Sequence, residues 1–103
     1  MVKIGFFVPS SHIEAVKLAM FDAGAGRIGH YDQCSWQTLG HGQFRPQEGS
    51  QPFLGKQGVC ERVEEYRVEM VCEDALAVEV ILAMKQAHPY EEAAYDVVQV
   101  LDI

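Results

Sequence analysis

The residues with the most evident chemistry are His88-Pro89-Tyr90-Glu91-Glu92, near the carboxyl end of the chain. An imidazole and two carboxylates lie close together there, so neutral nitrogen and anionic oxygen could coordinate zinc, copper or nickel. Proline at position 89 prevents helix continuation and favours an extended backbone at His88. We therefore expect this cluster in a connector at one end of the fold, where binding sites are commonly built.

Two further histidines could complete such a site if the fold brings them close. The candidate cation ligands are His12, His41, His88, Glu91 and Glu92. Their spacing lacks a tight motif such as H-E-x-x-H, so residues that only fill a loop or face water remain an alternative. The connector could also pack subunits together, with Tyr90 and Tyr95 as interface anchors. A metal-dependent hydrolase with Glu91 or Glu92 as base is the weakest alternative, and no catalytic residue is predicted.

Three glycines, Gly24, Gly26 and Gly29, match the G-x-G-x-x-G pattern of dinucleotide-binding loops. That fingerprint requires a strand before it and a helix after it. Here an amphipathic helix precedes the glycines and a strand follows them. We therefore interpret them as a helix C-cap followed by a tight turn.

The three cysteines, Cys34, Cys60 and Cys72, form an odd set without a C-x-x-C pair. This pattern does not indicate a disulfide framework, and buried thiols of this kind are usually inert. The apolar amino terminus reaches Pro9 before the core of a signal peptide could form. A reducing cytoplasm is therefore the expected location.

The charge balance excludes some classes of partner. The net charge is −7, from 8 basic and 15 acidic residues, and no Lys/Arg cluster is present. A nucleic-acid binder needs a basic surface to neutralise phosphates, and an anionic membrane attracts the same kind of surface. Neither partner is expected, and a protein partner remains open.

Hydrophobic periodicity divides the chain into strands and helices. Strands are predicted at residues 2–8, 34–39, 61–72 and from residue 95 to the carboxyl terminus. Ser11 and Glu14 form a capping box for a first helix that stops at Gly24. Asp74 can cap a second helix that ends at His88.

Two irregularities stand out between the second and third strands. Residues 46–58 hold three glycines and two prolines, which predicts a long loop of the kind that is functional or mobile. Val63 lies out of phase with the apolar face of the third strand, which indicates a bulge or an extension beyond the sheet.

The order β-α-β-β-α-β predicts a single α+β domain, residues 1–103, with a ferredoxin-like sandwich of two helices on one face of a four-stranded antiparallel sheet. In that topology His12, the long loop and residues 88–92 converge at one end, with His41 near them, and Gly24 lies at the opposite end. The last strand is apolar on both faces. Burial on both sides would require a homo-oligomer.

Several ordered blocks carry a resemblance to a known family. They are GAGRIGHY at residues 24–31, CSW at 34–36, GQFRP at 42–46, GKQG at 55–58 and AHPYEEAAYD at 87–96. Together they resemble a stand-alone version of the PII/CutA-like domain inserted in the YqfO-type, Nif-three-like, dinuclear-metal hexameric proteins. The resemblance implies a ferredoxin-like fold, trimers as the favoured assembly, and a regulatory role that senses a ligand or a divalent cation.

The resemblance does not carry over catalysis. In that family the two-metal centre lies in the halves that flank the inserted domain, and these 103 residues contain neither half. PII proteins bind nucleotide phosphates through glycine and lysine in the connector before the last strand. Residues 88–92 offer carboxylates there instead, and these would repel phosphate.

Overall fold

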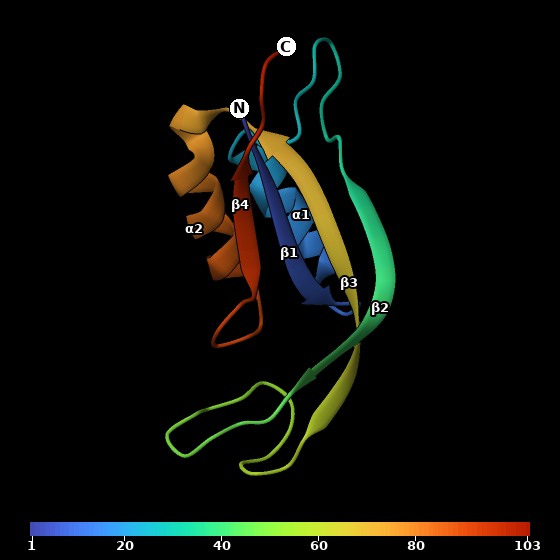
Figure 1. Cartoon of the computed structure of the whole chain (residues 1–103), viewed down its shortest axis with the longest axis vertical. Helices are drawn as coiled ribbons and strands as arrows, with labels where there is room; N and C mark the ends of the chain where they lie inside the picture. The colour runs from blue at the N-terminus through green and yellow to red at the C-terminus, as the bar shows by residue number, and fades with distance from the viewer.

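The computed structural model describes all residues, 1–103, in the order that hydrophobic periodicity predicts (Figure 1). The strands are β1 (Val2–Pro9), β2 (Trp36–Phe44), β3 (Glu61–Cys72) and β4 (Tyr95–Gln99). The helices are α1 (Ile13–Asp22) and α2 (Ala77–Ala87), and a 3₁₀ turn, η1 (Asp74–Leu76), leads into α2.

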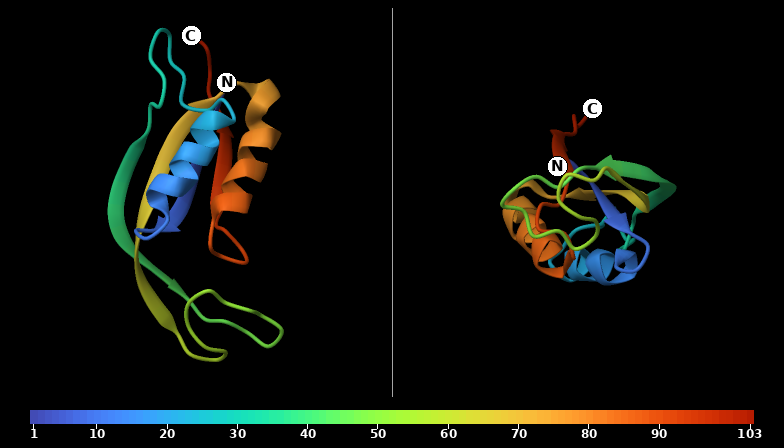
Figure 2. Two further views of the ribbon diagram at one scale, coloured as in Figure 1. Left: turned by 180° about the vertical axis from the view of Figure 1, so that it is seen from behind. Right: turned by 90° about the horizontal axis from the view of Figure 1, so that it is seen from below.

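The four strands form one antiparallel sheet in the order β2-β3-β1-β4. Both helices cover the same face of this sheet and leave the other face open (Figure 2). The predicted ferredoxin-like α+β sandwich is therefore confirmed.

The core lies between the helices and the covered face of β1 and β3. Successive side chains of a strand point to opposite faces, so alternate residues of β1 are buried here. The largest fully buried side chains are Ile4, Phe6, Val8, Val16, Met20, Val68, Val80 and Met84. Truncating the largest of them, Phe6, to alanine would cost about 3–5 kcal/mol of stability.

Strands β2 and β3 continue beyond the end of β1. Residues 65–72 of β3 pair with β1, whereas residues 61–64 pair only with residues 41–44 of β2. We call these two segments the two-stranded arm. The pairing of β2 with β3 continues without a break through Val63, so there is no bulge. Val63 is out of phase with the apolar face because it lies in the extension beyond the sheet. The arm contributes to the long axis of the molecule, which measures 46 Å.

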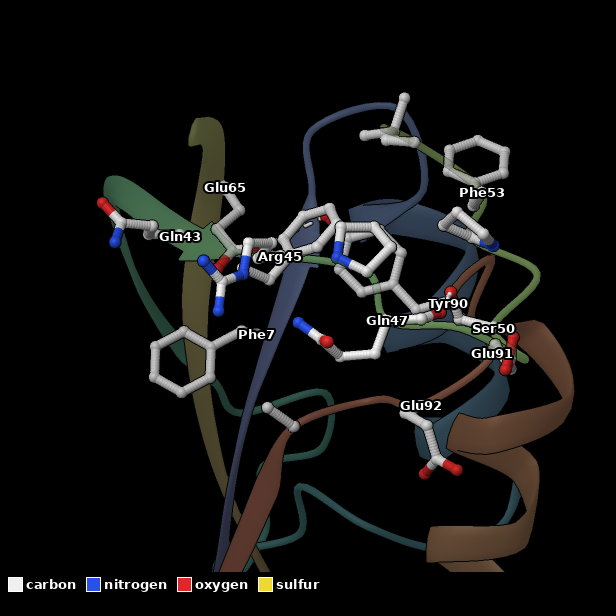
Figure 3. Close-up of a pocket in the computed structure, with 15 residues that line it drawn as sticks. Phe7, Gln43, Arg45, Gln47, Ser50, Phe53, Glu65, Tyr90, Glu91 and Glu92 are labelled. Carbon is white, nitrogen blue, oxygen red and sulfur yellow. Dashed lines mark hydrogen bonds between the residues drawn. The ribbon is translucent and has the colours of Figure 1, made fainter. Parts of the chain in front are cut away.

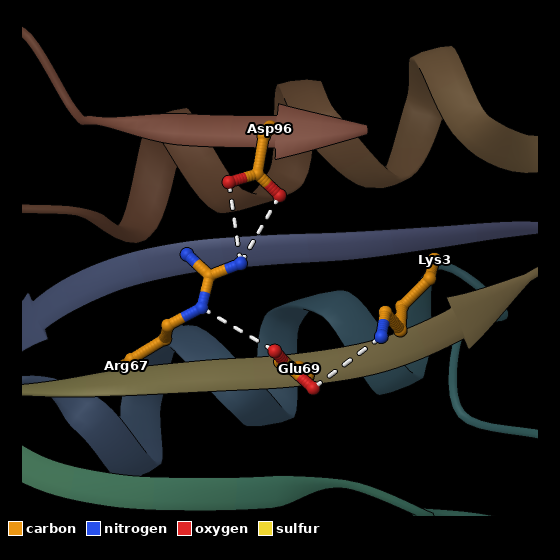
Figure 4. Close-up of polar contacts among 4 residues, drawn as sticks. All are labelled: Lys3, Arg67, Glu69 and Asp96. Carbon is orange, nitrogen blue, oxygen red and sulfur yellow. Dashed lines mark hydrogen bonds and ion pairs between the residues drawn. The ribbon is translucent and has the colours of Figure 1, made fainter. Parts of the chain in front are cut away.

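The open face of the sheet carries a chain of ion pairs (Figure 4). The Arg67 guanidinium lies 3.2 Å from an oxygen of Asp96 on β4 and 3.3 Å from Glu69, and Lys3 lies 3.7 Å from Glu69. Arg67 crosses over β1 at Gly5, where any Cβ atom would collide with the guanidinium. Glycine at this position therefore leaves the space through which Arg67 on β3 reaches Asp96 on β4.

The predicted caps at the helix starts are wrong. The Ser11 hydroxyl bonds the adjacent His12 Nδ1 at 2.8 Å, and His12 precedes the first residue of α1 without any side-chain cap. Asp74 does not cap its helix either, because its carboxylate lies 2.7 Å from the Met1 ammonium. In both cases the α-helix begins later than the capping pattern predicts, because His12 and Leu76 occupy the two N-cap positions.

The predicted C-cap at Gly24 is confirmed. Gly24 has φ +110°, a conformation that side chains disfavour. Its N–H donates to the Phe21 carbonyl, and the N–H of Ala25 donates to the Met20 carbonyl. This pair of bonds is the Schellman motif, and it satisfies carbonyls that the end of α1 leaves free.

Strand β4 is shorter than predicted and lies at an edge of the sheet. It ends at Gln99 and not at the carboxyl terminus, because Gln99 pairs with Val2, the first residue of β1. The expectation that both faces of β4 are buried is not met within one chain, since Val97 is 42% exposed and Val98 is 48% exposed. Neither helix has the length and apolar character needed to cross a bilayer.

Candidate functional site

A cavity of about 360 Å³ lies between the β2–β3 loop and the α2–β4 connector (Figure 3). Four aromatic rings line it, those of Phe7, Phe44, Phe53 and Tyr90. Its charged lining residues are Arg45, Glu65, Glu91 and Glu92. The cavity therefore combines apolar walls with a small number of polar groups, as ligand sites usually do.

The fold brings these residues together from distant parts of the chain. The loop folds back so that the Phe53 ring lies 5.5 Å from the His12 ring and 6.3 Å from the Tyr90 ring. The Gln51 N–H in the loop donates to the Glu91 carboxylate at 2.7 Å. The predicted convergence of His12, the long loop and the connector is confirmed, and Gly24 lies at the other end, against Leu76.

His88 has a structural position in this site. It is buried, its Nε2 lies 2.6 Å from the Phe7 carbonyl oxygen, and its Nδ1 accepts the Tyr90 N–H at 3.1 Å. These partners imply a neutral ring with the proton on Nε2. Burial is the main cause that lowers the pKa of His88; the bond to Phe7 opposes it and nearby His12 adds to it. Both ring nitrogens are occupied, so His88 offers no lone pair to a cation.

Tyr90 forms the centre of the aromatic wall. Its ring lies 4.8 Å from the His88 ring and 6.3 Å from the Phe44 ring. Its hydroxyl donates to Glu65 at 3.2 Å. Burial, followed by the charge of Glu65, raises the pKa of Tyr90 to about 12, so the hydroxyl keeps its proton at neutral pH.

The remaining predicted residues do not assemble into one cation site. Glu91 accepts the loop N–H, and Glu92 is exposed at the cavity. His41 lies on the two-stranded arm opposite Glu64, outside the cavity. No group of three or more His, Cys, Asp or Glu side chains is arranged to hold a metal ion. Tyr95 is on edge strand β4, with the Lys85 ammonium 5.1 Å from its ring centre.

Most of the cavity lining is not singled out by the sequence patterns, and Phe44, Phe53 and Glu65 are among these residues. The one available signal was Phe53, a large aromatic residue in a loop otherwise rich in glycine, proline and polar residues. Such a residue has little reason to be in a loop unless it packs against something. Nothing in the sequence distinguishes Glu65 from the other glutamates of β3, because the sequence does not show that Tyr90 reaches it.

Comparison with known proteins gives relatives of this chain, although no protein-family model matches it. The GTP cyclohydrolase 1 type 2 homolog of Mycobacterium leprae is 50% identical over 91 residues, which are 88% of this chain and 24% of that protein. The protein of the same name from Halalkalibacterium halodurans is 45% identical over 96 residues, 93% of this chain and 26% of that protein. The chain thus spans about a quarter of the length of the curated relatives it matches.

Solved structures agree with this relationship. A Bacillus cereus protein related to NIF3 superposes with a TM-score of 0.84 and 46% identity, covering 98% of this chain and 26% of that chain. CutA1 from Pyrococcus horikoshii superposes with a TM-score of 0.72, covering all of this chain and 86% of the other, and its 16% identity shows a shared fold alone. This chain is therefore homologous to one segment of the NIF3/YqfO-type proteins named GTP cyclohydrolase 1 type 2 homolog, and it has the CutA fold.

Proposed function

We propose that this chain is a regulatory module without catalysis of its own, which senses a small molecule in the cavity between the β2–β3 loop and the connector. The observation that carries the proposal is the cavity itself, whose volume of about 360 Å³ falls in the range of small-molecule sites. Its aromatic lining would bury an apolar ligand body, and its charged groups would set the ligand's orientation.

Sensing follows from the two parts that form the cavity. Phe53 belongs to the loop, whereas Tyr90 belongs to the connector that is bonded to β1 through His88. A ligand that contacts both parts stabilises the conformation in which they are close. Ligand binding can therefore shift the population of loop conformations, which a partner protein can recognise.

Binding of a divalent cation would be a more specific form of this proposal, but the available ligand atoms support it poorly. A structural neighbour from Archaeoglobus fulgidus bears the name periplasmic divalent cation tolerance protein CutA, and it superposes with a TM-score of 0.70 at 16% identity. Zinc, copper and nickel favour imidazole ligands, but both nitrogens of His88 are bonded within the fold. We therefore favour an organic ligand over a metal ion.

Homo-oligomerisation, with a trimer as the favoured assembly, is the second part of the proposal. It is supported by β4, an edge strand whose Val97 and Val98 are on opposite faces and about half exposed. Edge strands with apolar side chains readily pair with or pack on another chain. A cytoplasmic location agrees with the three free cysteines.

Thermal-shift and calorimetric titrations with a metabolite panel test the ligand proposal. The panel contains nucleotides, amino acids, amines, organic acids and divalent metals. We expect at least one organic compound to raise the melting temperature of the native chain but not of Phe53→Ala. Leu82→Ala is a matched control, because Leu82 on α2 is 54% exposed and Phe53 is 48% exposed. The proposal fails if no compound binds, or if every bound compound binds Phe53→Ala equally well.

A further inference from the structure

We propose that the cavity binds an organic cation, a protonated or quaternary amine carried on an apolar or aromatic body. This inference rests on the proposed function and names the chemical class of its ligand. It is derived from the charges that line the cavity, from the state of its carboxylates and from the arrangement of its rings.

Negative charge predominates in the cavity. Three carboxylates line it, those of Glu65, Glu91 and Glu92, against the single guanidinium of Arg45, and no lysine or histidine is present (Figure 3). The whole chain also has a net charge of −7. An anionic ligand would have to approach against this field, whereas a cation would be attracted by it.

The carboxylates also have free capacity to accept hydrogen bonds. Glu65 accepts the Tyr90 hydroxyl through one oxygen, Glu91 accepts the Gln51 N–H through one oxygen, and Glu92 has no partner. None of the three is in an ion pair with a basic side chain. An ammonium group, which has only donors, matches such acceptors.

The aromatic rings that line the cavity also favour a cationic ligand. The Phe44 and Phe53 rings each lie 6.3 Å from the Tyr90 ring, and all three residues line the cavity. Ring faces attract a cation within about 6 Å of the centroid, and they also bury the apolar body that carries it. The fourth ring, that of Phe7, already has the Arg67 guanidinium 5.1 Å from its centre.

A matched trio of compounds tests this inference: phenethylamine, 2-phenylethanol and phenylacetate, which share a ring but differ in charge. Binding is followed by NMR through the backbone N–H groups of Gln51 and Tyr90, because each donates a hydrogen bond to a side chain of the site. We expect phenethylamine to bind about tenfold more tightly than phenylacetate, with 2-phenylethanol between them.

Charge-removing variants identify the groups responsible. Glu65→Gln keeps an acceptor for the Tyr90 hydroxyl, and Glu92→Gln changes an exposed residue, so the second remains informative if the first misfolds. Each should weaken phenethylamine binding about threefold to tenfold and leave 2-phenylethanol unchanged. Glu64→Gln is the control, since Glu64 neighbours Glu65 in β3 but does not line the cavity.

The two proposals fail in different ways. Equal or tighter binding of phenylacetate, or unchanged phenethylamine affinity in both charge-removing variants, would overturn the organic-cation inference. So would a panel in which only an anionic or neutral compound binds, although the small-molecule function would then stand. If no compound of either panel perturbs the cavity amides, both proposals are wrong.

Discussion

The Nε2 atom of His88 lies 2.6 Å from the carbonyl oxygen of Phe7, although 81 positions separate the two residues in the sequence. The bond joins the exit of α2 to strand β1. A second bond, from the Phe7 N–H to the Ala94 carbonyl at 3.2 Å, attaches the far end of the connector to the same residue. The connector that forms one wall of the cavity is therefore fixed to the sheet at both of its ends.

Stability should decrease as the pH falls below about 6.5, the ordinary pKa of histidine. Burial lowers the pKa of His88 in the folded state, so the unfolded chain binds more protons between the two pKa values. Urea denaturation at about pH 7.5 and about pH 5.5 measures this loss. In His88→Gln the loss should shrink, at a cost of about 1–3 kcal/mol at neutral pH for the altered bonds. An unchanged pH dependence in His88→Gln would contradict the assignment; His41→Gln is the control.

Removing the Glu91 carboxylate should release the β2–β3 loop from the connector. The backbone N–H of Gln51 donates to Glu91 at 2.7 Å and has no other partner. Glu91→Ala should therefore speed the hydrogen exchange of this N–H by about tenfold or more. Glu92→Ala is the matched control, because Glu92 is the adjacent exposed carboxylate and lacks this bond. Equal exchange rates for Gln51 in both variants would show that the bond does not hold the loop.

Gly5→Ala should weaken the ion pairs of the open face. The new methyl group would displace the Arg67 guanidinium, which lies 3.2 Å from both Asp96 oxygens. Because the displaced group is a flexible side chain, we expect a loss of about 1–2 kcal/mol. In an Arg67→Met background the same change should cost clearly less. Chemical denaturation of the four proteins of this double-mutant cycle provides the measurement, and strict additivity would refute the explanation.

Val98→Lys should reduce the size of the assembly. Val98 lies beside Lys3 on the open face of β4, so a second lysine there adds repulsion and removes apolar surface from a subunit contact. Light scattering should report a trimer, or another oligomer, for the native chain and mostly monomer for the variant. Val78→Lys, on an exposed position of α2, should leave the assembly intact. A native chain that is already monomeric would eliminate this part of the proposal.

Most of the fold could be predicted because its elements depend on local patterns. The alternation in β1, the helical spacing that buries Val80 and Met84, and the stop at Gly24 each agree with the structure. The convergence of His12 with the β2–β3 loop and the connector followed from the predicted topology.

The details of the site could not be predicted, because they depend on backbone groups and on loop geometry. Histidine is a common metal ligand, but the Nε2 atom of His88 is bonded to the backbone carbonyl of Phe7. A contact with a backbone group cannot be inferred from the types of the side chains. The capping oxygen of Ser11 bonds the neighbouring imidazole, an alternative that the capping-box pattern does not encode. The path of residues 46–58, which brings Phe53 to Tyr90, has no periodicity from which to derive it.

The two-stranded arm has a mechanical consequence. Residues 41–44 and 61–64 pair only with each other, so the two-stranded arm lacks the support that a third strand or a helix gives to the rest of the sheet. Phe44, at the end of β2, faces Tyr90 across a ring separation of 6.3 Å. Twisting of the two-stranded arm would therefore change the distance between the Phe44 and Tyr90 rings, and a ligand that contacts both rings would restrict this twisting.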